Sequence, residues 1–307
     1  MISKVPSGEA RIETINTCNA SCSICARSTM TRPIWRMSYA FLGGILPQLE
    51  KVGITKISMF GFGEPLLDTR LPVKIKKARQ RHMDVTITTN GSLLDHNKAN
   101  LLFQSGLNHI RFSVHGLNKA TYEGVHHGLS WKGTISNILH FIWLNDNVYN
   151  HRIKTEVSVI PMHGEKVEDI RTFWEPFVDI LEIWRPHNWA GARDFRKVIR
   201  KKQTCGRPEN GPLQVQSNAK VVPCCFMTNG EVILGDLHKR KVIEILNSEE
   251  YEKFREAHRT GNLDGYPCSN CDQLNEYTQE DYPLLYSSID PKRKIGTTSV
   301  TKFNLEV

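Results

Sequence analysis

The chain has 307 residues, of which 39% are hydrophobic and 23% are charged, a composition typical of a globular protein with one large domain and one smaller domain. It contains no run of the roughly 18 to 20 apolar residues that a membrane-spanning helix requires, and residues 1–13 lack the apolar segment of a signal peptide. The sequence therefore predicts a cytoplasmic protein that does not enter a membrane.

The formal net charge is +8 at pH 7. Such an excess favours anionic partners, for example nucleic acid, acidic peptides or phosphorylated small molecules. Much of it lies in two basic runs, RDFRKVIRKK at residues 193–202 and PKRK at residues 291–294. Runs of this kind are most often solvated surface, so we do not expect nucleic acid to be the main partner.

Short apolar segments alternate with longer helical patterns over residues 10–187, which is the rhythm of a parallel sheet with crossover helices. The predicted strands cover residues 11–16, 56–61, 84–90, 109–116, 154–161 and 180–186. Helical spacing of apolar residues occurs at 39–53, 71–82, 97–106 and 133–147. This order predicts an α/β fold in which right-handed crossovers build a partial (β/α)6 barrel. Ligands of parallel sheets bind at the carboxyl ends of the strands, and every motif described below follows or ends a predicted strand.

The alternation stops near residue 190, so we expect a barrel over residues 1–190 and a basic connector over 191–204. A small α+β domain follows at 205–285, and a C-terminal tail at 286–307, whose last twenty residues we expect to be loosely held. Within the small domain, the segments 220–226 and 231–236 predict a hairpin closed by MTNG, because Asn-Gly favours tight turns. The segment 242–261 predicts one or two helices.

Three cysteines lie in CNASCSIC, a CxxxCxxC pattern formed by Cys18, Cys22 and Cys25 after the first predicted strand. Cysteines in a reducing compartment are more often metal ligands than disulfide partners, and thiolates suit iron-sulfur clusters. The spacing also fits a zinc site completed by a distant residue. The pattern resembles the signature of the radical S-adenosylmethionine (SAM) enzymes. That resemblance implies a 4Fe-4S cluster held by the three cysteines, with the amino and carboxylate groups of SAM on the fourth iron.

A second motif, GFGEP, ends the second predicted strand and is similar to the GGEP element of the same family, with Phe62 in place of a glycine. The resemblance implies that Gly61 and Gly63 let the backbone approach the methionyl group of SAM. It also implies that Glu64, which precedes Pro65, binds the ammonium group.

Three further segments extend the resemblance over nearly the whole chain. Ile24 occupies the position that contacts adenine in relatives, and SVIP at 158–161 resembles the element whose Ile160 flanks the adenine. TTNG at 88–91 falls where relatives place polar SAM contacts, which implicates Thr89 and Asn90. As a bare tetrapeptide, TTNG is also a common turn sequence.

The segment SVHG matches the S-x-D-G element of the family and implies that Ser113 contacts the carboxylate or ribose of SAM. His115 replaces the usual aspartate. Many relatives carry an arginine near position 126 that pairs with the SAM carboxylate, whereas this chain has His126 and His127. A histidine donates one hydrogen bond cleanly and is only partly charged near neutral pH. His126 is therefore either a SAM contact or an exposed loop residue.

The resemblance implies a chemistry that belongs to the cofactor. An electron donor such as flavodoxin or ferredoxin reduces the cluster, SAM is split to a 5′-deoxyadenosyl radical, and the radical abstracts a hydrogen atom from the substrate. The protein orients the radical and excludes water.

A second set of cysteines follows the pattern C-x18-C-x43-CxxC and consists of Cys205, Cys224, Cys268 and Cys271. It resembles the shortened auxiliary-cluster domain called twitch, a relative of the SPASM domain, and implies one fully ligated auxiliary 4Fe-4S cluster. Four cysteines with a CxxC are also a zinc-ribbon pattern. Neighbours on a strand point to opposite faces, so Cys225 should face away from the site that Cys224 faces. Cys225 is then a small buried residue or a hydrogen-atom donor.

The sequence leaves two classes of substrate open. The cysteine spacing most resembles the SAM-dependent 2-deoxy-scyllo-inosamine dehydrogenase of aminoglycoside synthesis, which implies oxidation of a polar small molecule. The alternative is crosslinking or epimerisation of a ribosomal peptide, and the first strand begins too early for the leader-binding module that often precedes the barrel. A third hypothesis is a non-catalytic iron-sulfur or zinc protein that binds nucleic acid. Glu64 and Ser113 at strand ends argue against it, because a binding module does not need them.

Two segments near the barrel mouth carry further candidates. Aromatic and basic residues at the end of the sixth predicted strand and just beyond it either contact the substrate or pack under the small domain: Trp184, Arg185, His187 and Trp189. The connector presents a basic set that either meets an acidic peptide leader or forms a solvated helix: Arg193, Arg196, Lys197, Arg200 and Lys201.

Overall fold

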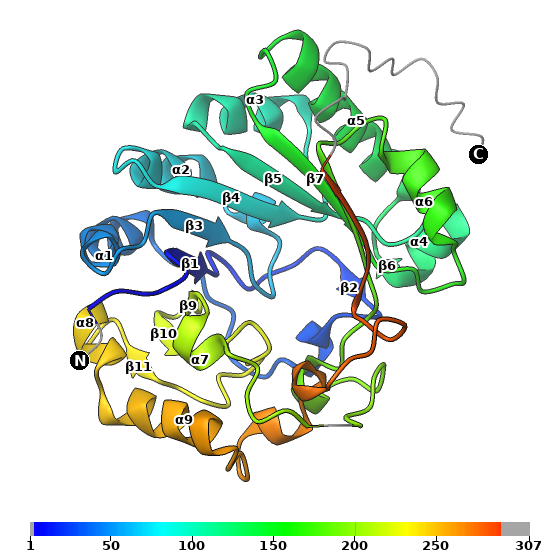
Figure 1. The fold of residues 1–307 in the computed structure, drawn as a ribbon. Coiled ribbons are helices and arrows are strands. Elements are labelled where there is room, and N and C mark those ends of the chain that lie inside the picture. The colour runs from blue at the N-terminus through cyan, green and yellow to red at the C-terminus, as the bar shows by residue number, and fades with distance from the viewer. Residues whose placement is uncertain (1–2, 200, 290–307) are drawn as a thin grey trace.

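A computed structural model describes residues 3–199 and 201–289. Its main sheet contains six parallel strands in the order β1-β3-β4-β5-β7-β8, and the sheet curves around one side of the molecule (Figure 1). These strands are β1 Glu9–Ile12, β3 Lys56–Met59, β4 Asp84–Thr89, β5 His109–Ser113, β7 Lys154–Val159 and β8 Ile180–Trp184. The predicted partial barrel is confirmed.

Several strands end earlier than predicted. β1 ends at Ile12 rather than at residue 16, β3 ends at Met59 rather than at 61, and β5 ends at Ser113 rather than at 116. Beyond these ends the backbone leaves the ladder to build the loops of the site. Gly116, for example, has a φ of 121°, which only glycine adopts readily.

Side chains alternate between the two faces of the sheet. On β5, Ile110 and Phe112 are fully buried, and Phe112 meets the ring of Phe141 on α5 (Trp131–Asn147) edge-on at 5.9 Å. Arg111 and Ser113 point to the inner face, where Arg111 forms an ion pair with Glu156 of the neighbouring strand. Because successive strand residues face opposite sides, this alternation puts apolar groups under the helices and polar groups inside the barrel.

Helices cover the outer face of the sheet (Figure 1). They are α1 Tyr39–Lys51, α2 Leu71–Arg79, α3 His96–Ser105, α4 Lys119–Val125, α5 and α6 Val167–Trp174. The four predicted helices correspond to α1, α2, α3 and α5. The sequence analysis missed α4 and α6, which have seven and eight residues and are too short for a clear apolar period.

The small domain extends the barrel sheet. β9 (Leu213–Val215) pairs in parallel with β1, and β10 (Lys220–Val222) and β11 (Gly235–Asp236) follow in antiparallel order. The predicted hairpin is therefore correct in pairing β10 with β11. MTNG does form a turn, in which the N–H of Gly230 donates to the carbonyl of Met227 at 3.4 Å, but this turn does not join the two strands directly. Residues 223–234 form a long loop that carries Cys224, and the short connection is the one between β9 and β10.

The remaining elements complete the small domain and the other edge of the sheet. Short helix α7 (Arg207–Asn210) precedes β9, and the segment predicted to hold one or two helices forms two, α8 (Val242–Leu246) and α9 (Glu249–Thr260). β12 (Leu284–Ile289) pairs antiparallel with β8, so the expected start of the tail at 286 falls inside a strand. Residues 290–307, which include the basic run at 291–294, lie outside the described residues.

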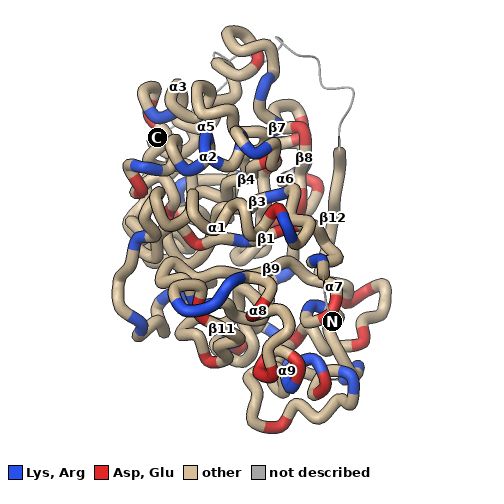
Figure 2. Tube along the Cα trace, turned by 90° about the vertical axis from the view of Figure 1, so that its left-hand side faces the viewer, with Lys and Arg blue, Asp and Glu red and all other residues tan. Residues whose placement is uncertain are grey.

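Charged residues of both signs are interspersed along the trace (Figure 2). The described connector is irregular rather than helical, and two of its arginines are used internally. Arg193 donates to the carbonyl of Cys25, and Arg196 contacts Asp272 and the hydroxyl of Tyr277. The expected solvated helix is therefore wrong. In the described part of the chain, no helix has the length and apolar character needed to cross a membrane.

Candidate active site

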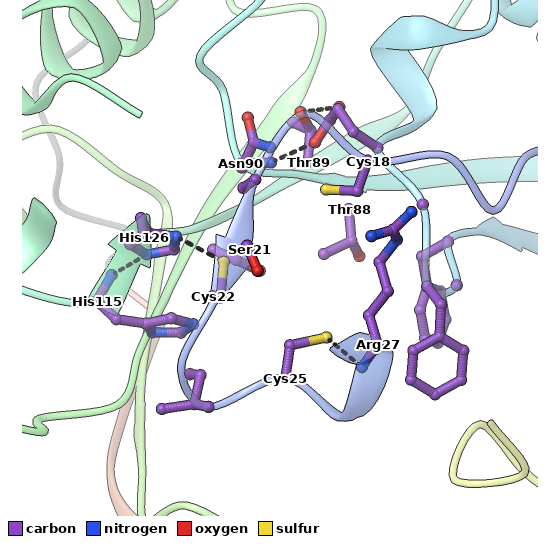
Figure 3. Close-up of a pocket in the computed structure, with 18 of the residues that line it drawn as sticks. Cys18, Ser21, Cys22, Cys25, Arg27, Thr88, Thr89, Asn90, His115 and His126 are labelled. Carbon is purple, nitrogen blue, oxygen red and sulfur yellow. Dashed lines mark hydrogen bonds between the residues drawn. The ribbon is translucent and has the colours of Figure 1, made fainter. Parts of the chain in front are cut away.

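One cavity of about 260 Å³ lies at the carboxyl ends of the strands (Figure 3). The residues predicted to hold the first cluster and SAM all line it: Cys18, Cys22, Ile24, Cys25, Gly61, Gly63, Glu64, Thr89, Asn90, Ser113, His126 and Ile160. They come from the loop after β1, from the ends of β3, β4, β5 and β7 and, in the case of His126, from the segment that follows α4. Parallel strands deliver them to one edge because their carboxyl ends all point the same way.

The cysteine loop is held by short local structure. β2 (Ser21–Cys22) pairs antiparallel with β6 (His126–His127), and the Sγ of Cys25 accepts a hydrogen bond from the backbone of Arg27 at the start of the 3-10 helix η1 (Ala26–Thr29). The three thiols face a shared space (Figure 3). Burial raises the pKa of all three, that of Cys22 to about 12, so the unloaded thiols are protonated at neutral pH and metal binding must release those protons.

Glu64 has a fixed orientation. Its side chain is 2% exposed, and it accepts hydrogen bonds from the Thr89 hydroxyl at 2.6 Å, from the backbone N–H of Asn90 at 2.8 Å and from that of Leu66 at 3.0 Å. Burial raises the pKa of this carboxyl. A cationic ligand in the cavity would restore the ionised form, because an opposite charge offsets the cost of burial.

Gly61 and Gly63 are required by packing as well as by any approach of a ligand. A Cβ at Gly61 would lie 2.4 Å from Cγ of Glu13, and a Cβ at Gly63 would lie 2.2 Å from the carbonyl oxygen of Ile15. Both contacts are with the loop that leads to the cysteines. The glycines therefore let the β3 loop lie directly against the cysteine loop.

Glu13 joins this region to the small domain. Its buried carboxylate forms an ion pair with Arg32 at 2.6 Å and accepts hydrogen bonds from the backbones of Phe62 and Ser217. Arg32 also donates to the carbonyl of Thr228. Since each buried polar group here has a partner, the network fixes the position of the site loops relative to the small domain.

Thr89 and Asn90 make hydrogen bonds to other residues of the site. The Thr89 hydroxyl donates to Glu64, and the side-chain amide of Asn90 donates to Asn19 in the cysteine loop at 3.0 Å. The end of β4 therefore connects the carboxylate of GFGEP to the cysteine loop. The turn reading of TTNG is correct only in part, because Thr88 and Thr89 belong to β4 and the turn begins at Gly91, whose φ is 76° and whose carbonyl accepts the N–H of Leu94.

His126 is a buried residue, 2% exposed, so its reading as an exposed loop histidine is wrong. The backbone N–H of His115 donates to Nε2 at 3.0 Å, and Nδ1 lies 3.3 Å from the Sγ of Cys22. Since Nε2 accepts, the proton of the neutral ring is on Nδ1 and is directed at the thiol. Burial lowers the pKa of His126 to about 4. Both nitrogens are thus engaged, and the expected contact with the SAM carboxylate finds no free donor on this ring.

His115 stacks on His126, with ring centres 5.0 Å apart, and faces the same cavity. Its Nδ1 accepts a hydrogen bond from the backbone N–H of Ile160 at 3.0 Å. The proton of the neutral ring is therefore on Nε2. The histidine that replaces the usual aspartate ties the end of β5 to the end of β7.

Sequence reasoning missed several polar residues of the lining: Arg27, Ser28, Thr88 and Ser158. Strand alternation could have identified Ser158, because it follows the inward-facing Glu156 by two residues on β7. Arg27 follows Cys25 by two residues but carries no recognisable pattern of its own.

Of the four residues proposed after the sixth strand, Trp189 alone lines this cavity. Its indole N–H donates to the carbonyl of Ile24 at 2.8 Å. The ring lies between Phe62 of the barrel, at 5.6 Å, and Phe226 of the small domain, at 5.3 Å. Arg185 instead binds backbone carbonyls near β12, and the Trp184 indole donates to Glu182.

His187 stacks on Phe226 and meets Trp189 edge-on. Burial, followed by the charges of Arg196 and Arg207, lowers the pKa of His187 to about 4. Between this value and its ordinary value near 6.5 the unfolded chain binds more protons than the folded chain, so stability falls as the pH falls. We expect the free energy of unfolding to decrease from pH 6.5 to pH 4 with a His187 contribution of at most about 1.4 kcal/mol per pH unit. Urea unfolding of wild type and His187→Phe at pH 5 and 7 measures it, and equal pH dependence in both would contradict it.

A second cavity is lined by all four cysteines of the second set: Cys205, Cys224, Cys268 and Cys271. Burial raises the pKa of the last three to about 12. Arg207 lines the same cavity. Cys225 lines neither cavity, and its Sγ lies 3.8 Å from Nη1 of Arg207. Strand alternation does not govern it, because β10 already ends at Val222.

Both donor sets fit iron-sulfur clusters. Within residues 3–199 and 201–289, no three Cys, His, Asp or Glu side chains converge as the ligands of a single metal ion do. Cluster ligands are spread more widely, because each thiolate binds a different iron. Three thiols surround the first cavity and four surround the second, so the first set leaves one iron for an external ligand and the second leaves none.

Comparison with protein families agrees with both sites. The family model of the radical SAM superfamily matches residues 12–174, and that of the SPASM domain, an iron-sulfur cluster-binding domain, matches residues 205–272. The chain belongs to the radical SAM superfamily. As a radical SAM enzyme with a SPASM domain, it uses SAM, a 4Fe-4S cluster and an auxiliary iron-sulfur cluster. The predicted cofactors are confirmed, and the two cysteine sets are iron-sulfur sites rather than zinc sites.

The names of individual relatives refer to different substrates. A probable GTP 3′,8-cyclase of Methanocaldococcus jannaschii is 29% identical over 175 residues, covering 56% of this chain and 57% of that protein. The chain spans about three fifths of the length of the cyclases it matches first. The crystal structure of BtrN in complex with AdoMet and 2-DOIA has a TM-score of 0.65 at 20% identity and covers 92% of this chain and 100% of BtrN. Streptococcus suis SuiB bound to precursor peptide SuiA has a TM-score of 0.67 at 14% identity, covering 89% and 71%.

Proposed function

We propose that this radical SAM enzyme oxidises a polar small molecule, removing one hydrogen atom and then one proton and one electron, with the auxiliary cluster as acceptor of that electron. When bound, the first cluster and SAM supply the chemistry, a 5′-deoxyadenosyl radical that abstracts the substrate hydrogen atom. The observation that carries the proposal is the first cavity, in which three thiols and the strand-end residues of the SAM motifs face one space. An external electron donor, such as flavodoxin or ferredoxin, completes the proposal.

In this proposal, the residues of this chain have the following roles. Cys18, Cys22 and Cys25 hold the cluster. Glu64, fixed by three donors, binds the ammonium group of SAM, and Ser113 binds its carboxylate or ribose. His126 positions Cys22 through the contact of Nδ1 with Sγ.

Further residues shape the two ends of the cavity. Ile24 and Ile160 flank the adenine, and both line the cavity. Trp189 closes the side toward the small domain. Exclusion of water on that side protects a reactive radical from side reactions.

Two observations favour a polar small molecule over a peptide. The first cavity carries polar groups that have no predicted role toward SAM, namely Arg27, Ser28 and Thr88. An acidic leader was one of two expected partners of the basic connector, but two of its arginines, Arg193 and Arg196, bind groups of the chain itself. GTP, in the name of the cyclases, is a small molecule. The peptide alternative rests on the fold shared with SuiB, whose structure contains a precursor peptide.

The test is an anaerobic assay of the reconstituted full chain with dithionite and SAM. We expect release of 5′-deoxyadenosine, and we expect a matching polyol, amino sugar or nucleotide to increase that release and to lose two mass units itself. Deuterium at the oxidised carbon of that substrate should appear in 5′-deoxyadenosine. Stimulation by a short peptide and by none of the small molecules would favour the maturase alternative, and no release at all would contradict the proposal.

A further inference from the structure

One buried polar atom beside the second cavity has no partner. His258 lies on α9 and is 1% exposed. Its Nδ1 lies 3.0 Å from the hydroxyl of Thr204, whereas Nε2 is buried and makes no hydrogen bond with any described residue. Leaving a buried donor or acceptor unsatisfied costs about 1–3 kcal/mol. The ring lines the cavity that the four cysteines surround, which is where a ligand is expected.

Neighbouring hydrogen bonds determine what Nε2 offers. The Thr204 hydroxyl accepts the backbone N–H of Gly206 at 3.0 Å. Among the described residues, its own hydrogen has one acceptor within reach, which is Nδ1 of His258. A neutral imidazole with an accepting Nδ1 carries its proton on Nε2. His258 therefore presents an N–H donor to the second cavity.

The surroundings strengthen this donor. Apolar side chains form much of the remaining lining, among them Phe254, one turn earlier on α9, and Met227 and Leu274. A hydrogen bond is stronger in such a poorly solvated site than in water. Arg207 adds a positive charge beside the thiols of Cys205 and Cys224, and a positive charge stabilises the more negative, reduced state of a cluster.

We propose that His258 donates a hydrogen bond from Nε2 to a sulfur of the auxiliary iron-sulfur cluster and thereby raises the reduction potential of that cluster. His258 is a positioning residue that acts through the cluster, since hydrogen bonds to cluster sulfurs help to set their potentials. The inference rests on the proposed function in one respect, that the auxiliary cluster accepts an electron. A higher potential makes that acceptance more favourable.

The test is an EPR-monitored redox titration of the full chain in which Cys18, Cys22 and Cys25 are replaced by alanine, so that only the auxiliary cluster contributes. In this background we expect His258→Leu to lower the ratio of reduced to oxidised cluster about tenfold at a fixed potential, equal to about 59 mV for a one-electron couple. His258→Gln keeps an N–H donor near the position of Nε2 and should recover most of the shift.

Phe254→Leu is the packing control, because the Phe254 ring lies 4.9 Å from that of His258 and lines the same cavity, but its replacement removes no N–H donor. It should shift the potential by much less than His258→Leu does. Equal potentials in His258→Leu and Phe254→Leu, with four irons per chain in both, would overturn the inference and leave the proposed oxidation intact. Absence of iron at this site in the background chain would overturn the inference together with the auxiliary part of the proposed function.

Discussion

Cys22→Ala should reduce SAM cleavage to the background of an assay without enzyme, whereas Cys268→Ala should leave measurable, uncoupled cleavage and no product. The reason is that the two cysteine sets line different cavities, and neither lining contains a cysteine of the other set. Cleavage requires only the first cluster with SAM bound to it. Release of 5′-deoxyadenosine by the reconstituted variants, measured beside iron content, gives the result.

Cys225→Ala is the control for this pair. Cys225 is a cysteine of the same small domain but lines neither cavity, so both cleavage and product should stay at the wild-type level. Equal loss of cleavage in Cys22→Ala and Cys268→Ala, with both proteins folded, would show that the second site is not a separate electron or positioning centre.

Gly63→Ala should destabilise the site loops and prevent full loading of the first cluster. The added Cβ would meet the carbonyl oxygen of Ile15 at 2.2 Å and that of Thr17 at 2.7 Å, and backbone atoms cannot rotate away as a flexible side chain can. The backbone of Glu64 donates to the same Thr17 carbonyl at 2.8 Å, so relief of the clash must disturb that bond. Overpacking of this kind costs about 1–3 kcal/mol. Urea unfolding and iron content after anaerobic reconstitution measure the two effects.

Gly44→Ala provides the opposite expectation in the same protein. Gly44 lies inside α1, and a Cβ there would meet no atom within 4 Å. Alanine is favoured over glycine in a helix by up to about 1 kcal/mol, so this variant should be slightly more stable than wild type. If Gly63→Ala were as stable as Gly44→Ala and bound as much iron, the result would contradict the close packing of the β3 loop against the cysteine loop.

The barrel could be predicted from the sequence because its strands and helices are marked by local patterns of apolar residues. Apolar residues such as Ile110 and Phe112 alternate with polar neighbours, and the helices between strands repeat apolar residues every three to four positions. Strand ends were less accurate. The residues beyond the ends of β1 and β3 bind partners far along the chain instead, as when the N–H of Glu64 binds the carbonyl of Thr17.

The small domain shows the same limit. Asn-Gly at 229–230 is a strong local signal for a tight turn, and a turn forms there, but Asn229 also makes a long-range contact. Its side chain accepts from the backbone of Thr31 at 2.6 Å and donates to the carbonyl of Thr29, which attaches the loop of the small domain to the segment after the first cysteines. A contact across about 200 positions in the sequence has no local pattern, so the Asn-Gly signal predicted the turn at 227–230 but not this attachment.

The histidines are the clearest case within the site. His126 and His115 could be noted as departures from the family motifs, but the sequence could not reveal that one ring faces Cys22 while the other accepts the N–H of Ile160. The direction of each ring follows from backbone donors on other strands. Likewise, the unpartnered Nε2 of His258 exists only because α9 packs beside the four cysteines.

Cysteine spacing and strand-end motifs determined by themselves that this chain is a radical SAM enzyme with two cluster sites, because ligand identity and spacing are properties of the chain. The tertiary structure alone decided which donors fix Glu64, why Gly63 must be a glycine, and which histidine faces which sulfur. Those features depend on distances between segments that are remote in sequence, and such distances are set only when the strands and the small domain pack together.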